Sequence, residues 1–344
     1  MNMVRSARQP TIVDVARDAG VAISTVSRYL NGVPTRRANR ERIEIAIEQL
    51  GFRRNAMAAA MKSDRSHMIG IMAPVLDEFH SAVLERLATR LRQTGRVLVT
   101  YCHGGDTKVM HEIVDFISTQ RLDGLFIAGE APLRDRTDDL IRRGTPVIFY
   151  NNELRGLWAD RVLVDNRNAS RRAVNHLLDL DHTRIAIIHG SLDASSAVDR
   201  LAGYRDALEA AGVPVTSDYE RDGRWLPDGG YHAMEQLMSQ SRPPTALFVT
   251  NYRMTIGALA WIKERGLSVP DDLSLICFDD IEAFPLMRPA ITVLSQPVEA
   301  ITNSLAEMLF SRLGDPSLPP RAMTLECSLI LRDSTQKLSP DAER

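Results

Sequence analysis

The chain has 344 residues, of which 44% are hydrophobic and 25% charged, and a formal net charge of −2. This length and composition fit two or three globular domains with full hydrophobic cores. No apolar run approaches the ~20 residues of a membrane span, and no apolar segment of a secretory signal is visible at the N-terminus. The widely spaced Cys102, Cys277 and Cys327 favour reduced thiols and a cytoplasmic protein over a disulfide framework.

The stretch Thr11–Asn31, TIVDVARDAGVAISTVSRYLN, is the first clear pattern in the chain. Thr11 precedes Asp14 by the spacing of a capping box, which indicates the start of a helix. Apolar residues then recur at helical spacing, Gly20 permits a tight turn, and a second apolar stripe follows it. This pattern predicts a helix-turn-helix, whose second helix enters the major groove of DNA, with an ordinary helical hairpin as the alternative.

Charge favours the DNA-binding interpretation of this segment. Residues 1–62 contain eleven Lys or Arg and five Asp or Glu, a net charge of +6. Because the whole chain carries −2, the other 282 residues carry −8. A small basic segment on an acidic remainder is typical of a protein in which one part binds the phosphate backbone.

A third helix is predicted over Arg36–Leu50 and ends at Gly51. Its predicted apolar face consists of Ile43, Ile45, Ala46, Ile47 and Leu50. The following NAMAAAMK at Asn55–Lys62 is rich in helix formers but too short to be a stable helix alone. It is expected to be helical only when packed on a partner, or else to be a plain linker helix.

From Met68 onward, short apolar runs alternate with amphipathic stretches, which predicts parallel sheets covered by helices on both faces. The runs are 69–73, 97–101, 124–128, 146–150, 184–190, 246–250 and 273–278. Such sheets bind ligands beyond the carboxyl ends of their strands. The candidate segments are therefore Pro74–His80, His103–Asp106, Asn151–Asn152, Ser191–Arg200, Asn251–Tyr252 and Asp279–Asp280.

These features together resemble the LacI/GalR family of transcriptional regulators over about residues 10–333. Further landmarks are QLGFRRNAMAAAMK, QRLDGLFIAG, TPVIFYNN, VDNRNASRRAVNHLLDLDHTRIAIIHG, RLAGYRDALEAAG, PTALFVTN, GLSVPDDLSLICFDD and RPAITVLSQP. The resemblance implies an α/β protein with an N-terminal three-helix helix-turn-helix head and a two-lobed body like type I periplasmic binding proteins. It also implies a homodimer, since the tetramerising C-terminal heptad helix of some members is absent.

The implied domains are a DNA-binding head at 1–54, a hinge helix and linker at 55–66, an effector-binding and dimerisation body at 67–333, and a disordered tail at 334–344. Lobe N is expected at about 67–165 and 292–320, and lobe C at about 166–291 and 321–333. The three crossings between the lobes are expected near Asp165–Asn166, Ala290–Thr292 and Arg321.

The resemblance places the start of the second helix against base edges. Arg28 is long enough for a bidentate contact with guanine, and a phosphate contact is its alternative. Ala22 stands where the family usually has serine, and Met61 of the hinge stands where a leucine usually wedges into the minor groove. The predicted DNA-binding residues are Thr11, Ala22, Ile23, Ser24, Thr25, Ser27, Arg28, Asn31, Asn55, Ala58 and Met61.

A polyol pocket needs converging polar groups and one apolar face. The predicted effector-binding residues are Phe79, Asn151, Ser196, Arg200, Trp225, Asn251 and Asp279. The alternative for Trp225 is a role in the hydrophobic core, and the alternative for Asp279 is a role as a helix cap. Asn151 and Tyr252 stand where sugar-binding members usually carry aspartate, and Cys277 replaces a glycine. A less acidic pocket that keeps Arg200 predicts an anionic effector, such as a sugar acid or sugar phosphate, rather than a neutral sugar.

Other classes of protein fit the sequence less well. No P-loop, GxSxG, HExxH or dinucleotide-binding glycine motif is present, so no enzyme is predicted. A sugar carrier would need no basic head. His103 and Asp106 lack partners at metal-ligand spacing, and no metal or cofactor is expected. The sequence therefore predicts a regulator, more readily an inducible repressor than a corepressor-type or activating member, which binds a palindromic operator and no membrane.

Overall fold

The computed structural model describes residues 10–30, 32–52 and 66–339. The chain divides into two compact units, Met1–Ser66 and His67–Arg344, which we call the N-terminal and C-terminal units and describe separately. Within the described ranges, no helix is both long and apolar enough to cross a membrane.

The described part of the N-terminal unit contains α1 (Ile12–Asp18), α2 (Ile23–Leu30) and α3 (Arg37–Leu50). The capping box forms, since Thr11 Oγ1 accepts from Asp14 N at 3.4 Å and Thr11 N donates to Asp14 Oδ2 at 2.8 Å. The turn between α1 and α2 contains Gly20 in the left-handed region, at φ 61°. The small core consists of Val15, Ala16, Ala19, Val26, Ile43 and Ala46.

One predicted core position of α3 is wrong. Ile45 was expected on the apolar face, but its side chain is 54% exposed. Each helical residue turns by about 100°, so a residue two positions after buried Ile43 points to the opposite side. Gly51 ends the helix at φ 60°, as predicted.

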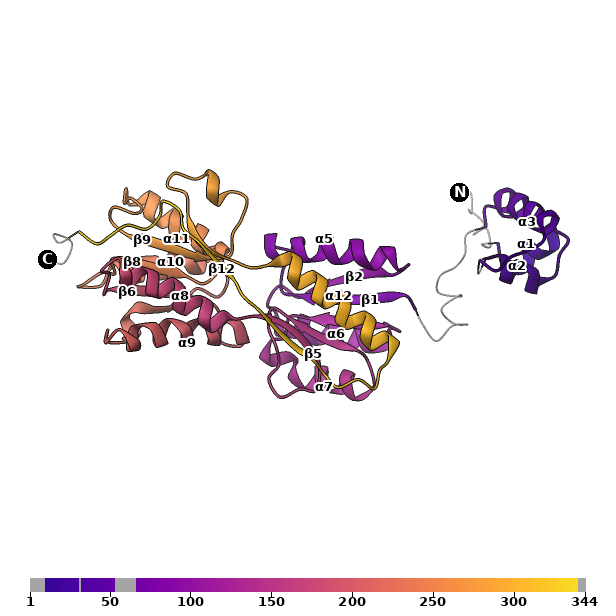
Figure 1. Cartoon of the computed structure of the whole chain (residues 1–344), viewed down its shortest axis with the longest axis horizontal. Coiled ribbons are helices and arrows are strands. Elements are labelled where there is room, and N and C mark those ends of the chain that lie inside the picture. The colour runs from indigo at the N-terminus through magenta and orange to yellow at the C-terminus, as the bar shows by residue number, and fades with distance from the viewer. Residues whose placement is uncertain (1–9, 31, 53–65, 340–344) are drawn as a thin grey trace, which may run out of the picture. The chain divides into compact units, whose positions relative to one another are not determined.

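The C-terminal unit contains two six-stranded sheets, one in each lobe (Figure 1). In lobe N the strand order is β11-β5-β4-β3-β1-β2, and all pairs are parallel. These strands are β1 (Met68–Ala73), β2 (Val97–Cys102), β3 (Gly124–Ile127), β4 (Val147–Tyr150), β5 (Asp160–Val164) and β11 (Ala322–Leu325). The helices are α5 (Glu78–Gln93), α6 (Thr107–Thr119), η1 (Ala131–Leu133), α7 (Arg134–Arg142) and α12 (Val298–Gly314).

In lobe C the order is β12-β10-β9-β8-β6-β7, and only β12 pairs antiparallel, with β10. The strands are β6 (Ile185–His189), β7 (Glu220–Asp222), β8 (Ala246–Val249), β9 (Ser274–Phe278), β10 (Thr292–Ser295) and β12 (Ser328–Ile330). The helices are α8 (Asn166–Asp179), α9 (Ser195–Ala210), η2 (Ser217–Tyr219), α10 (Pro227–Met238), α11 (Tyr252–Glu264) and η3 (Phe284–Leu286).

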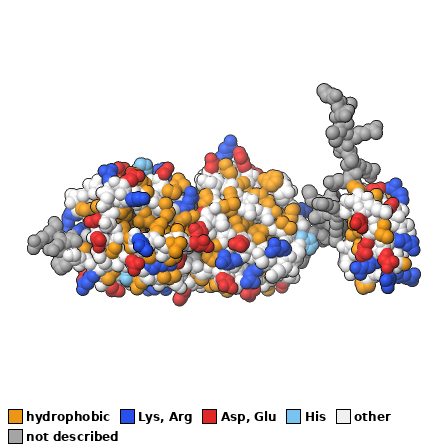
Figure 2. Space-filling view, turned by 90° about the horizontal axis from the view of Figure 1, so that it is seen from above, with side chains coloured by type: hydrophobic (Ala, Val, Ile, Leu, Met, Phe, Trp, Pro, Cys, Tyr) orange, Lys and Arg blue, Asp and Glu red, His pale blue; other side chains and the backbone are white. Residues whose placement is uncertain are grey.

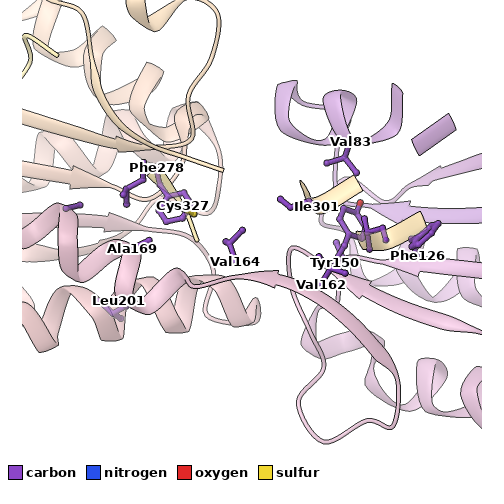
Figure 3. Close-up of a cluster of buried hydrophobic side chains, with 14 of the residues drawn as sticks. Val83, Phe126, Tyr150, Val162, Val164, Ala169, Leu201, Phe278, Ile301 and Cys327 are labelled. Carbon is purple, nitrogen blue, oxygen red and sulfur yellow. The ribbon is translucent and has the colours of Figure 1, made fainter. Parts of the chain in front are cut away.

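Both sheets are covered on both faces, which explains their continuous apolar strands. One hydrophobic cluster includes α5 and α12 of lobe N and α8 and α9 of lobe C. In Figure 3 this cluster falls into two groups, with Val164 between them where the chain passes from one lobe to the other. The opposite faces are closed by α6 and α7 in lobe N and by α10 and α11 in lobe C.

Two of the three predicted crossings are misplaced. The first does follow β5, but β10 belongs to the sheet of lobe C and β11 to that of lobe N. The second and third crossings therefore lie between β10 and α12 and between β11 and β12. Strand pairing decides this, because β10 is in register with β9, and β11 with β5.

The expected disordered tail is also wrong for residues 334–339, which pack on lobe C. The Ser334 side chain is fully buried. Its hydroxyl donates to Leu275 O at 2.6 Å and accepts from Thr292 N at 2.8 Å. Gln336 N donates to Ser274 Oγ at 3.1 Å. These bonds fix the segment at the start of the central strands β9 and β10. Residues 340–344 lie outside the described part.

Candidate functional site

The N-terminal unit exposes the start of α2. Ala22 and Ser24 are exposed, Ile23 is 47% exposed, and Thr25 and Ser27 are half-buried. The carbonyl of Ala22 accepts from Thr25 N and Val26 N, so the helix begins without a capping hydroxyl at this position. The amphipathic pattern produces this face, because Val26 turns inward and its neighbours outward.

Exposed arginines occur on α2 and α3 of the same unit. Arg28 is exposed, as are Arg36 and Arg42, and none of the three forms an ion pair with a described residue. By contrast, Arg37 and Arg40 pair with Glu41 and Glu44 on the surface of α3. An arginine without an ion pair can bind an anionic partner without first breaking a bond within the protein, which favours phosphate binding.

Of the remaining predicted DNA-binding residues, only Thr11 lies within the described part of the chain. Thr11 uses its hydroxyl in the capping box, where it also donates to Asp14 Oδ2 at 2.6 Å. Asn31, Asn55, Ala58 and Met61 lie outside the described residues.

In the C-terminal unit a cavity of about 390 Å³ lies between the lobes. All seven predicted effector-binding residues line it: Phe79, Asn151, Ser196, Arg200, Trp225, Asn251 and Asp279. They come from the carboxyl ends of the strands and from the segments that follow. Their convergence is the geometry expected of a ligand site in doubly wound sheets.

Arg200 is buried on α9 and held from several sides. Its Nε donates to Asn166 Oδ1 at 2.8 Å, and its Nη1 donates to Thr250 O at 2.5 Å. The guanidinium carbon lies 3.4 Å from the centroid of the Phe278 ring. Burial lowers the pKa of Arg200, and the charge of Asp279 opposes this effect. The side chain is therefore a fixed cation with little freedom to move.

Asp279 faces the same cavity with its backbone in the left-handed region, at φ 83°. Burial raises the pKa of its carboxyl, while Arg200 and a hydrogen bond from Gln296 lower it. Gln296 Nε2 donates to Asp279 Oδ1 at 2.7 Å, and the buried Gln296 Oε1 has no partner among the described residues. Asp279 is thus oriented by a neighbour that retains one free acceptor.

Trp225 is half-buried and packs over Gly190. A Cβ at position 190 would lie 2.0 Å from the Trp225 ring, so only glycine allows this packing. Phe79 lines the cavity from lobe N. The amide of Asn251 has a structural role as well, because its Oδ1 caps α11 by accepting from Met254 N at 2.9 Å. The cap leaves the Asn251 amide nitrogen for another partner.

Hydrogen bonds join the lobes at both rims of the cavity. On one rim Asn152 Oδ1 accepts from Ser196 N at 3.0 Å, and Glu153 N donates to Ser195 Oγ at 2.9 Å. On the other, Glu78 N donates to Tyr252 Oη at 3.1 Å. Tyr252, which stands where aspartate is usual in the family, therefore ties the lobes together.

Three cavity residues, His80, Glu130 and Asp193, were not among the predicted effector-binding residues. His80 and Asp193 lie within the candidate segments, whereas Glu130 lies in none of them. His80 Nδ1 contacts Asp77 Oδ1 at 2.7 Å, while its buried Nε2 has no partner among the described residues. Glu130 follows the carboxyl end of β3. The rule that gave the other candidate segments, to look just past each strand, would therefore have found it.

The prediction that the pocket would be less acidic, and would therefore favour an anion, is not supported by its charges. Five carboxylates line the cavity: Asp77, Glu130, Asp193, Asp222 and Asp279. Three guanidinium groups oppose them: Arg200, Arg224 and Arg253. Carboxylates from other elements replace those missing at positions 151 and 252.

His103 and Asp106 have separate structural roles. His103 Nδ1 accepts from Gly105 N at 3.2 Å, and Asp106 caps α6 by accepting from Lys108 N at 2.7 Å. Over the described residues, no group of three or more His, Cys, Asp or Glu is arranged to hold a metal ion.

Comparison with known proteins identifies the family. The model for bacterial regulatory proteins of the lacI family matches residues 11–55, and that for a periplasmic binding protein-like domain matches 174–335. The regulator AscG of Escherichia coli K12 is 30% identical over 330 residues, which cover 94% of this chain and 98% of AscG.

Two solved structures are similar over most of the chain. A Lac repressor dimer bound to operator and the anti-inducer ONPF has a TM-score of 0.84 at 26% identity, covering 96% of this chain and 100% of that one. The regulator CelR in complex with cellobiose has a TM-score of 0.72 at 27% identity, covering 94% and 99%. The chain belongs to the LacI family of bacterial transcriptional regulators.

Proposed function

We propose that this protein is a transcriptional repressor that binds operator DNA through α2 and is controlled by a small molecule bound between its lobes. The supporting observation is one chain that carries both an exposed helix start, in a unit whose Arg28, Arg36 and Arg42 form no ion pair with a described residue, and a cavity into which polar groups from two lobes converge. Family membership supports it further, since AscG is a transcriptional regulator and the Lac repressor was solved on its operator.

The effector is proposed to be a sugar or a related polyol. CelR binds cellobiose, a disaccharide, and the cavity here combines carboxylates and amides with the Trp225 ring. Carboxylates accept hydrogen bonds from hydroxyl groups, and aromatic rings cover the apolar face of a sugar. The buried His80 Nε2 and Gln296 Oε1, which have no partner within the described part of the chain, would gain one from such a ligand.

We propose that a homodimer is the DNA-binding form, as in the Lac repressor structure. Large apolar side chains are exposed in both lobes: Leu76, Val97 and Phe116 in lobe N, and Ile256 and Leu286 in lobe C. Figure 2 shows hydrophobic side chains gathered over both lobes on one face. A dimer places two helix-turn-helix units on the two halves of a palindromic operator. Sedimentation equilibrium of the full chain measures this state.

Effector control follows from a two-state arrangement of the lobes. A ligand that contacts both lobes stabilises the closed arrangement by its differential affinity for that state, and no further. If closure weakens operator binding, the ligand acts as an inducer.

The test is a mobility-shift assay with DNA from the promoter next to the gene, titrated with and without candidate sugars. We expect specific binding at nanomolar concentrations that one sugar class weakens. Failure to bind this DNA, or binding that no added sugar changes, would contradict the proposal in its DNA-binding or its effector part respectively.

Met61 carries a separate proposal about the hinge, that its side chain wedges between central base pairs in the minor groove. Opening a base step costs a few kcal/mol and kinks the duplex. Met61→Ala is therefore expected to reduce operator affinity and DNA bending, whereas Met61→Leu keeps both. Circular-permutation gel shifts measure the bend, and an unchanged bend in Met61→Ala rules the wedge out.

A further inference from the structure

Most charges in the cavity have a neighbour of opposite sign. Asp77 is bonded to His80 and interacts electrostatically with Arg253, and Asp279 interacts with Arg200. Asp222 accepts from the backbone of Arg224, which carries a cation two residues away. These contacts involve three of the five carboxylates and two of the three guanidinium groups, those of Arg200 and Arg253. Glu130 and Asp193 are left.

The backbone brings Glu130 and Asp193 together from opposite lobes. Glu130 forms an antiparallel bridge with Ala194, and Ala131 N donates to Asp193 O at 3.1 Å. Both side chains line the cavity, and the negative charge of Asp193 acts on the Glu130 carboxyl. Two carboxylates are therefore held close at the line where the lobes meet.

The other groups that face Glu130 do not neutralise the pair. His103 Nε2 lies 3.8 Å from Glu130 Oε1, but burial lowers the pKa of His103 to about 4, so the ring is neutral near pH 7. His80 lowers the pKa of Glu130, but by less than Asp193 raises it, and His80 is bonded to Asp77. Burial and then Asp193 raise the pKa of Glu130 to about 7. Within the described part of the chain, no Lys or Arg forms an ion pair with either carboxylate.

We propose that Glu130 and Asp193 form a subsite for a protonated amino group, so that the effector is a hydroxylated amine such as an amino sugar. This inference rests on the proposed function and deepens it. An ammonium carries three donors and a positive charge, and it can bond both carboxylates at once. Because these belong to different lobes, the amine replaces their repulsion with attraction and favours closure.

A second observation points to a ligand at the same wall. The His80 side chain is only 6% exposed, and its buried Nε2 has no partner among the described residues although it lines the cavity. A hydroxyl group next to the amine would satisfy this nitrogen. The subsite therefore recognises an amine within a polyol and disfavours a carboxylate or phosphate at that end.

The experiment compares matched compounds on the full chain: glucose, glucosamine, gluconate and glucose 6-phosphate, with the galactose and mannose counterparts. Isothermal calorimetry and thermal unfolding measure binding. We expect an amino sugar to bind at least about tenfold more tightly than its parent sugar, which corresponds to one charge-assisted interaction. Glu130→Gln and Asp193→Asn should each abolish this preference, while Glu112→Gln on the exposed face of α6 retains it.

A measurement without ligand tests the unbalanced pair directly. The thermal unfolding midpoint of Glu130→Gln minus that of the wild type is measured at pH 5.5 and at pH 8.5. We expect this difference to be larger at pH 8.5, by about 2–4 °C or more. The reason is that only the wild type must ionise this buried carboxyl as the pH rises. An equal difference at both pH values overturns the proposal.

The binding measurements with sugars can also overturn the proposed amine subsite. Equal or tighter binding of a parent sugar, an acid or a phosphate does so. So does failure of every amino sugar to raise the midpoint of the wild type by more than it raises the midpoint of Glu130→Gln. Operator binding by the wild type without ligand is measured separately. Loss of that binding would reject the proposed function, whereas its presence with a negative ligand arm rejects only the amine subsite.

Discussion

Gly190 determines the position of an aromatic wall of the cavity. Its missing side chain leaves room for the Trp225 ring, and the ring is further constrained by the left-handed backbone of Trp225, at φ 62°. A single methyl group at position 190 collides with that ring. The shape of the effector site thus depends on a residue that offers no chemistry of its own.

We expect Gly190→Ala to displace the Trp225 ring and to lower the free energy of unfolding of the C-terminal unit by about 1–3 kcal/mol, the usual cost of overpacking. Urea unfolding and tryptophan fluorescence measure these effects. Gly314→Ala is the control, because nothing lies within 4 Å of a Cβ there. Unchanged stability and emission in Gly190→Ala would show that the ring adapts.

Arg28 is the residue in α2 that we expect to read a base. Loss of a bidentate contact with guanine costs about 1–3 kcal/mol of discrimination, or roughly 5- to 150-fold in affinity for the specific site. Arg28→Ala should therefore weaken specific binding far more than non-specific binding. Arg42→Ala, which removes another exposed and unpaired arginine, should weaken both alike. Gel shifts with operator and scrambled DNA compare them, and equal losses for both variants would assign Arg28 to phosphate.

At the scale of elements, short strands complete both sheets. β11 and β12 follow each other closely in sequence, yet they pair in different sheets, with β5 and β10. The described residues after β12 continue along lobe C, where Ser334 is bonded to both Leu275 and Thr292. The end of the described chain is therefore anchored to lobe C through the buried Ser334.

We predict that Ser334→Ala lowers the free energy of unfolding by about 1–3 kcal/mol, because it leaves a buried N–H without its acceptor. Chemical denaturation of the full chain measures the loss. Ser239→Ala on the exposed end of α10 serves as a control with little effect. A loss no larger than that of the control would mean that residues 334–339 contribute little to lobe C.

At the scale of the whole C-terminal unit, the closed lobes depend on a few polar bonds at two rims. Asn152 reaches from lobe N to the first turn of α9 in lobe C. Within the described residues, hydrogen bonds and the ion pair of Arg155 with Asp199 join the rims, and no disulfide does. Contacts of this kind are individually weak. Such contacts suit a switch that a small ligand can shift.

Asn152→Ala removes one bond between the lobes and is expected to disfavour closure by about 1 kcal/mol, a factor of about five in the closed population. Small-angle X-ray scattering should give a larger radius of gyration than for wild type. Asn303→Ala, on the exposed side of α12, should not change it. An unchanged radius in Asn152→Ala would place the control of closure elsewhere.

Local patterns were enough to predict most of the elements. The capping box at Thr11, the turn at Gly20 and the apolar runs of β1, β2, β3, β4, β6, β8 and β9 are dictated by neighbours in sequence. The same reasoning gave the segments that hold six of the seven predicted residues, because the carboxyl ends of parallel strands meet at one edge. Trp225 lies in none of those segments. β5 was not predicted, since its buried Asp160 breaks the apolar pattern and is stabilised by Arg312, far away in sequence.

Only the tertiary structure decided the crossings and the charge of the cavity. Strand register assigned β10 and β11 to their lobes, and no local pattern encodes which distant strand is the partner. Likewise, positions 151 and 252 suggested a loss of acid, but Glu130 and Asp193 converge on the cavity from opposite lobes. Sequence alone determined the family, the basic helix-turn-helix and the two-lobed body. The balance of charge in the site depends on distances between residues far apart in the chain, and folding alone sets those distances.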